Sequence, residues 1–135
     1  MSRTVVCDAS AVVALLVDGG PDGHWTASAL QESTLVAPAL LPFEVTNILR
    51  RLEASAVITM DLSSQSHADL LALTVELWPH ELLANRVWEL RRNLTAYDAA
   101  YVALAERLEA PLVTLDRRIA RAPGLRCEVS VPPRP

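Results

Sequence analysis

Four acidic residues occupy positions from which metal-dependent chemistry is possible: Asp8, Glu44, Asp98 and Asp116. Asp8 follows the apolar run 4–7, and Asp116 follows the apolar run 112–115. Carboxylates that gather in a partly buried place repel one another unless they share protons or bind a cation. Oxygen ligands suit Mg²⁺ or Mn²⁺, and such ions support hydrolysis of phosphate esters. The pattern indicates a divalent-metal site if the fold brings the four side chains together.

Each acid taken alone has a simpler explanation. Asp8 and Asp116 can cap the helices that follow them, because aspartate is favoured at helix starts. Asp98 lies three residues after Thr95, as in a Thr-x-x-acid capping pattern. Glu44 can be a solvated helix residue. Helix N-termini favour carboxylates, but this preference would scatter acidic residues along the sheet edge and would not bring four of them to one point. The occurrence of all four acids together therefore favours the metal site.

The hydrophobic pattern predicts strands that alternate with helices. The expected strands are 4–7, 35–37, 74–78, 112–115 and about 126–131. The expected helices begin near 10 and 117 and cover about 24–31, 40–54, 61–71, 80–92 and 95–108. Strands separated by helices imply a parallel arrangement. We therefore predict an α/β fold, a three-layer α/β/α sandwich around a central, mainly parallel sheet of four to five strands, with Asp8 and Asp116 at the carboxyl ends where ligands bind.

Length and composition indicate one domain spanning 1–135, with a frayed tail at about 132–135. The 135 residues are 51% hydrophobic, which is enough for a continuous core. No segment approaches the roughly 20 apolar residues of a membrane span, so we expect no membrane association and a cytoplasmic location. Cys7 and Cys127 fall in expected strands without metal-ligand spacing, which predicts buried thiols in a reducing compartment.

The charge pattern is acidic overall but locally basic. Net charge is −4, and all 12 basic residues are arginine. Clusters occur at 50–51, 91–92 and 117–118, and arginine suits phosphate binding, although a general preference for arginine explains any one cluster equally well. The absence of lysine argues against receiver domains and haloacid-dehalogenase-like phosphatases, which use a lysine near their aspartates. Ser10 and Thr114 stand beside the acids and can orient a carboxylate or satisfy local backbone groups.

Four stretches resemble the sequence motifs of PIN domains: 6–11, 41–47, 94–105 and 112–118. The match follows the family's order over nearly the whole chain, and within the family it is similar to the VapC-type toxins of toxin–antitoxin pairs. The resemblance implies an Mg²⁺- or Mn²⁺-dependent endoribonuclease that cleaves structured RNA (tRNA or rRNA), is neutralised by a VapB-like antitoxin and forms a homodimer.

Carried over by position, the resemblance assigns metal binding and catalysis to the four acids. Ser10 and Thr114 match small hydroxyl positions beside them. Arg117 and Arg118, close in the chain to Asp116, are candidate contacts to the RNA backbone. Exposed aromatic residues would assist such contacts, whereas core packing is the expected role of Trp88.

A catalytically silent module that holds a partner helix is the alternative. The expected helices near 10–17 and 40–49 carry more apolar residues than one buried face requires, which can mark a partner groove. Complete burial of both helices in the core explains the same pattern equally well. Stabilisation by Mn²⁺ would separate the enzyme from the silent module.

Overall fold

The computed structural model describes residues 3–134 of this chain. Its strands are β1 (Arg3–Cys7), β2 (Ser33–Pro38), β3 (Val75–Trp78), β4 (Leu112–Val113) and β5 (Val129–Ser130). Its helices are α1 (Ala9–Val17), α2 (Pro21–Leu30), α3 (Leu41–Ala54), α4 (Met60–Ala72), the 3₁₀ turn η1 (His80–Leu82), α5 (Ala84–Glu89), α6 (Ala96–Leu108) and α7 (Arg117–Arg121). The predicted frayed tail ends at Pro135, which lies outside the described residues.

The strands form one parallel sheet in the order β3-β2-β1-β4-β5. Central strand β1 pairs Val6 with Val36 on one side and with Leu112 on the other. Its last three residues are fully buried, as expected for a parallel strand with helices on both faces. The predicted α/β class and its mainly parallel sheet are confirmed.

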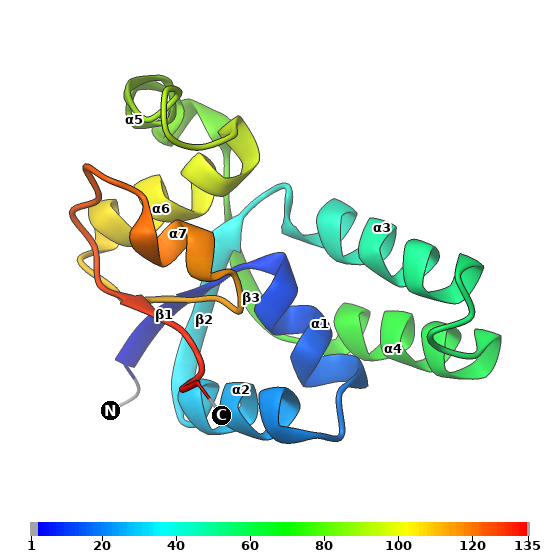
Figure 1. Cartoon of the computed structure of the whole chain (residues 1–135). Coiled ribbons are helices and arrows are strands. Elements are labelled where there is room, and N and C mark those ends of the chain that lie inside the picture. Colours follow the sequence, from blue (N-terminus) through cyan, green and yellow to red (C-terminus); the bar gives the residue numbers. More distant parts are fainter. Residues whose placement is uncertain (1–2, 135) are drawn as a thin grey trace.

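The connections place helices on both faces of the sheet. From β1 the chain passes through α1 and α2 to β2, and through α3 and α4 to β3; it then returns through α5 and α6 to β4. Right-handed crossovers in opposite directions put the two groups on opposite faces. In Figure 1, α1, α3 and α4 lie to the right of the sheet, whereas α5 and α6 lie at the upper left. Ligand sites in such folds lie where the strand order reverses, here between β1 and β4.

The helix α6 packs closely on the sheet because several of its buried residues are alanines. Ala99 and Ala103 are buried, and the helix contacts β1, β2 and β4. Thr95 caps it by accepting a hydrogen bond from the Asp98 N–H at 3.2 Å. This close packing brings Asp98 near the carboxyl ends of the strands.

The predicted single helix over 80–92 is wrong. It divides into η1 and α5 at Leu83, whose φ of −114° departs from helical geometry. The break directs Leu83 into the core, where it is 3% exposed. The predicted core role of Trp88 is also wrong: its side chain is 67% exposed, with the Arg91 guanidinium 4.3 Å from the ring centroid. Val87 faces the core instead, and Trp88 follows it on the outer side.

The last two strands are shorter than predicted. β4 ends at Val113 because the Leu115 N–H turns to donate to the Ser10 hydroxyl at 3.0 Å. Cys127 lies outside β5 and is half-buried, contrary to its predicted place in a strand. Cys7 lies in β1 as predicted, and burial raises the pKa of its thiol to about 12. Among residues 3–134, no helix has the length and apolar character to cross a membrane.

Candidate metal centre

Asp8 is a buried carboxylate held by three donors at the end of β1. It is 6% exposed. The Ser10 hydroxyl and the Ala11 N–H donate to Oδ1 at 2.7 and 3.0 Å, so Asp8 does cap α1. The Thr114 hydroxyl donates to Oδ2 at 2.5 Å. Burial nevertheless raises the pKa of Asp8, since desolvation outweighs these hydrogen bonds.

Ser10 and Thr114 join the ends of β1 and β4. Each hydroxyl donates to Asp8 and accepts a backbone N–H from the chain after β4: Leu115 donates to Ser10 at 3.0 Å, and Asp116 donates to Thr114 at 3.0 Å. The sequence left two roles open for these residues, orienting a carboxylate and pairing with backbone groups. The hydroxyl oxygens of Ser10 and Thr114 perform both roles. They fix the position of Asp116 relative to Asp8.

Asp98 is the acid that connects the other three. It lies half-buried in the first turn of α6. Desolvation raises its pKa first, and repulsion from Asp116 raises it further. The negative charge of Asp98 in turn raises the pKa of both Asp8 and Glu44. These charge effects indicate that Asp98 lies near Asp8, Glu44 and Asp116 at this edge of the sheet.

Glu44 is directed into the site by a tyrosine. It lies in the first turn of α3, and its Oε1 accepts a hydrogen bond from the Tyr101 hydroxyl at 2.6 Å. Tyr101 is 1% exposed and follows Asp98 by three residues, so one side of α6 presents both. Desolvation raises the pKa of Glu44, although the tyrosine hydrogen bond opposes that rise. Sequence reasoning missed Tyr101; its spacing from Asp98 was the available indication.

Asp116 differs from the other acids because an arginine already neutralises it. Arg118 donates from Nε to Oδ1 at 3.1 Å and from Nη2 to Oδ2 at 2.7 Å. This pairing lowers the pKa of Asp116. Arg117 points elsewhere, donating a hydrogen bond to the Pro132 carbonyl. Of the two predicted RNA contacts, Arg118 therefore lies at the acid cluster and Arg117 lies against the C-terminal segment.

The donor set suits a hard divalent cation by its chemistry. All four groups are carboxylates, and three of them have raised pKa values that a bound cation would reverse. Within residues 3–134, however, no three acidic, histidine or cysteine side chains lie close enough to form a ready ligand set. Mg²⁺ keeps several waters and needs few direct carboxylates, which fits this open arrangement.

Comparisons with known proteins agree with the fold. The model of the family described as "PIN domain" matches residues 5–125. The chain belongs to the PIN-domain family. Ribonuclease VapC1 of Mycobacterium tuberculosis is 44% identical over 131 residues, covering 93% of this chain and 96% of the relative. Within the family, this PIN domain is therefore of the VapC type.

Two solved structures show the same PIN fold. PAE2754 from Pyrobaculum aerophilum has a TM-score of 0.65 and 27% identity, covering 96% of this chain and 84% of that one. A VapBC2 complex from Rickettsia felis, bound to a DNA fragment from its promoter, also gives a TM-score of 0.65, with 15% identity and coverage of 94% and 98%. The predicted PIN-like architecture is confirmed.

A groove of about 410 Å³ lies between α3 and α4 of this PIN domain. Phe43 and Leu71 line it and are 81% and 72% exposed. By contrast, the apolar residues of α1 are either buried or packed against the core. The sequence left open whether the apolar residues of these two helices lie in the core or form a partner groove. The structure gives a different answer for each helix: α1 belongs to the core, whereas α3 leaves apolar surface uncovered.

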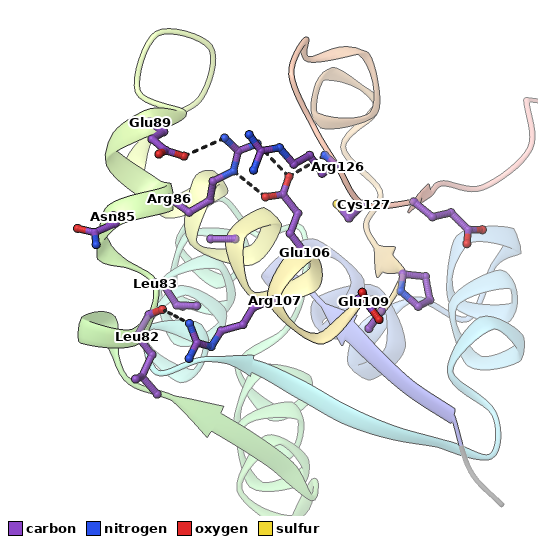
Figure 2. Close-up of a pocket in the computed structure, with 14 residues that line it drawn as sticks. Leu82, Leu83, Asn85, Arg86, Glu89, Glu106, Arg107, Glu109, Arg126 and Cys127 are labelled. Atoms are coloured by element: carbon purple, nitrogen blue, oxygen red, sulfur yellow. Dashed lines mark hydrogen bonds and ion pairs between the residues drawn. The ribbon is translucent and has the colours of Figure 1, made fainter.

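Another cavity, of about 720 Å³, lies at the amino ends of β4 and β5, beside Pro111 and Glu128. Figure 2 shows Glu106 between Arg86 and Arg126 in its wall. Glu106 accepts from Arg86 Nε at 2.6 Å and from the Arg126 N–H at 2.7 Å. These hydrogen bonds join α5 and the segment before β5 to α6. The charged residues in the wall of this cavity therefore have a structural role.

Proposed function

We propose that this chain is a VapC-type toxin, an endoribonuclease that hydrolyses an RNA phosphodiester with Mg²⁺ or Mn²⁺. The observation that carries the proposal is the placement of the four acids at the strand-order reversal. Thr114 links Asp8 to the Asp116 backbone, and the charge of Asp98 raises the pKa of Asp8 and of Glu44. Ribonuclease VapC1, which is 44% identical over nearly its whole length, supports the activity class. The proposed substrate is structured RNA, either tRNA or rRNA. The activity is proposed to reside in a single nuclease domain spanning 1–135, and the proposed location of the protein is the cytoplasm.

Asp8, Asp98 and Asp116 would hold the metal ion, which when bound lowers the pKa of a water molecule and offsets charge on the phosphate. Ser10 and Thr114 keep Asp8 in one orientation through hydrogen bonds of 2.7 and 2.5 Å. Tyr101 holds one oxygen of Glu44, which leaves the other oxygen either to bind the metal ion directly or to act on a water molecule as an orienting group or base.

Cleavage of total RNA in Mg²⁺ or Mn²⁺ tests the site directly. Asp8→Ala and Asp98→Ala should each lose at least about a hundredfold in rate, since each removes a charge that the reaction needs. Exposed Glu53→Ala is the matched control and should cleave like the wild type. An Asp8→Ala or Asp98→Ala protein that cleaves at the wild-type rate would refute the assignment.

The groove between α3 and α4 supports a second element of the proposal, a VapB-like antitoxin that covers Phe43 and Leu71. An amphipathic helix is the expected occupant, because such helices place apolar anchors into grooves of this kind. Phe43→Ala should weaken binding of the protein encoded by a neighbouring reading frame, whereas Val57→Ala, also exposed, should not. A homodimer remains part of the proposal and is checked by sedimentation equilibrium.

A catalytically silent module that only holds the partner helix is the alternative. The same groove favours it, as does the lack of a ready three-ligand set in residues 3–134. The enzyme should gain thermal stability from Mn²⁺, and Asp98→Ala should abolish that gain. A silent module would show no such gain in either protein.

A further inference from the structure

The guanidinium of Arg118 forms an ion pair with Asp116, a carboxylate that the proposed metal site would use as a ligand. The fork of Arg118 covers both carboxylate oxygens, at 3.1 Å from Nε to Oδ1 and 2.7 Å from Nη2 to Oδ2. The Arg118 N–H also donates to Oδ1 at 2.9 Å. Oδ1 therefore already has two donors, and a metal ion approaching Oδ2 would meet the positive guanidinium.

The charge of Arg118 acts on Asp98 as well as on Asp116. Its positive charge lowers the pKa of Asp98, opposing the rise caused by desolvation and by Asp116. Arg118 thus supplies to two of the four acids part of the neutralisation that a metal ion would supply. Arg121, on the same helix, lowers the pKa of Asp116 by its charge only, without a contact to the carboxylate.

The pair is built to open easily. The Arg118 side chain is 80% exposed and that of Asp116 is 23% exposed, so water screens the interaction. An exposed ion pair shifts an equilibrium by only about two- to fivefold. The Arg118 side chain can leave while its backbone N–H stays bonded to Asp116, because the cap of α7 depends on the backbone bond.

We propose that Arg118 is a displaceable counter-ion: it neutralises Asp116 in the metal-free protein, is released when Mg²⁺ or Mn²⁺ binds, and then binds a phosphate group of the RNA. The inference rests on the proposed function for the identity of both ligands. Guanidinium forks match phosphate as well as carboxylate, so the released group has a partner. Metal and RNA each favour release, and each therefore strengthens binding of the other.

Metal affinity tests the first half without any turnover. Mn²⁺ titration followed by electron paramagnetic resonance should show about two- to fivefold tighter binding to Arg118→Gln than to the wild type. Arg121→Gln removes the same charge from the same helix without removing a contact, and should tighten binding less. Equal affinity of Arg118→Gln and Arg121→Gln would overturn the competition.

RNA affinity tests the second half, with Ca²⁺ as a cation that should bind without turnover. A fluorescent RNA hairpin should bind the wild type more tightly in Ca²⁺ than in chelator. In Arg118→Gln the increase in RNA affinity caused by Ca²⁺ should be smaller by about threefold or more. In chelator, the RNA affinities of the variant and of the wild type should be the same. An equal gain from Ca²⁺ in both proteins would overturn release toward RNA.

The outcomes separate this inference from the proposed function. Mn²⁺ binding that is abolished by Asp98→Ala and unchanged by Arg118→Gln overturns the inference and leaves the metal site standing. A wild-type protein that binds no Mn²⁺ overturns both.

Discussion

The Thr114 hydroxyl donates to Asp8 Oδ2 at 2.5 Å while accepting the Asp116 N–H at 3.0 Å, so a single oxygen atom links the acids that follow β1 and β4. Thr114 is fully buried and Asp8 is 6% exposed. Water therefore has little access to replace the hydroxyl. Thr114 therefore helps to set the position of Asp116 relative to Asp8, together with Ser10 and the backbone pairing of β1 with β4.

Replacing Thr114 by valine should destabilise the metal-free protein by about 1–3 kcal/mol, because a buried carboxylate oxygen and a backbone N–H both lose a partner. Thr114→Ser keeps the hydroxyl and should lose less. Urea denaturation at neutral pH measures the free energy of unfolding of both variants. If valine were tolerated as well as serine, the hydroxyl would not be holding Asp8.

Asp98→Asn should stabilise the metal-free protein at neutral pH while removing its activity. The folded-state pKa of Asp98 is raised, so ionisation of this residue costs stability as pH rises from about 3.9 through that raised value. Removing the charge should return about 0.5–2 kcal/mol at pH 7. Asp116 has the opposite sign: its lowered pKa contributes stability at neutral pH that is lost on acidification.

Thermal unfolding in chelator at pH 4 and at pH 7 checks the Asp98→Asn prediction. The gain in Tm should be larger at pH 7, and Glu53→Gln, an exposed carboxylate, should change little at either pH. A lower Tm for Asp98→Asn at pH 7 would show that Asp98 stabilises the fold, contrary to the direction of its pKa.

The part of the site that lies at strand ends was predictable because it is local. An apolar run followed by aspartate marks where a buried strand leaves the sheet, and this placed Asp8 and Asp116 at one edge. The order of the strands then had to make β1 and β4 neighbours, which they are. Asp98 was also approachable from the sequence, since its helix begins at a recognisable threonine cap.

Contacts between elements distant in the chain could not be predicted in this way. Glu44 and Tyr101 are 57 residues apart, and their hydrogen bond depends on how α3 and α6 are placed against the sheet. The break at Leu83 has the same origin, because a continuous helix satisfies the local apolar pattern equally well. Only the competition for core space decides that Val87 is covered and Trp88 is exposed.

Gly23 should be intolerant of alanine because α2 crosses the end of α1 at very close range. A Cβ atom at Gly23 would lie 1.8 Å from the Asp18 carbonyl oxygen, so the two helices would have to separate. We expect Gly23→Ala to cost about 1–3 kcal/mol of stability. Gly19→Ala, whose Cβ would meet nothing within 4 Å, should stay close to the wild type in the same denaturation experiment.

Glu106→Gln should weaken the fold without changing the metal site. The Glu106 side chain is 9% exposed and accepts two hydrogen bonds from Arg86, at 2.6 and 3.2 Å, and one from the Arg126 N–H (Figure 2). Loss of its charge should cost about 1–3 kcal/mol. Glu89, also paired with Arg86 but 60% exposed, is the control, and Glu89→Gln should change stability by less than about 1 kcal/mol. Mn²⁺ affinity should be unchanged in both.

Tyr101→Phe should reveal what Glu44 contributes. The substitution preserves the buried ring and removes the hydroxyl that donates to Glu44 at 2.6 Å, a hydrogen bond that lowers the pKa of Glu44. Without it the pKa of Glu44 should rise further, and metal binding, which requires ionised carboxylates, should be lost at a higher pH than in the wild type. Cleavage at saturating Mn²⁺ should fall by about tenfold or more, since Glu44 would no longer be held in one orientation.

Tyr97→Phe is the control for Tyr101→Phe, because it removes a hydroxyl from an exposed tyrosine on the same helix. It should leave both the Mn²⁺ pH profile and the cleavage rate unchanged. If Tyr101→Phe matched Tyr97→Phe in both measurements, Glu44 would not need its tyrosine anchor. If only the cleavage rate fell while the Mn²⁺ profile stayed in place, Glu44 would act on the water molecule and not on the metal ion, which decides between the two roles that its free oxygen permits.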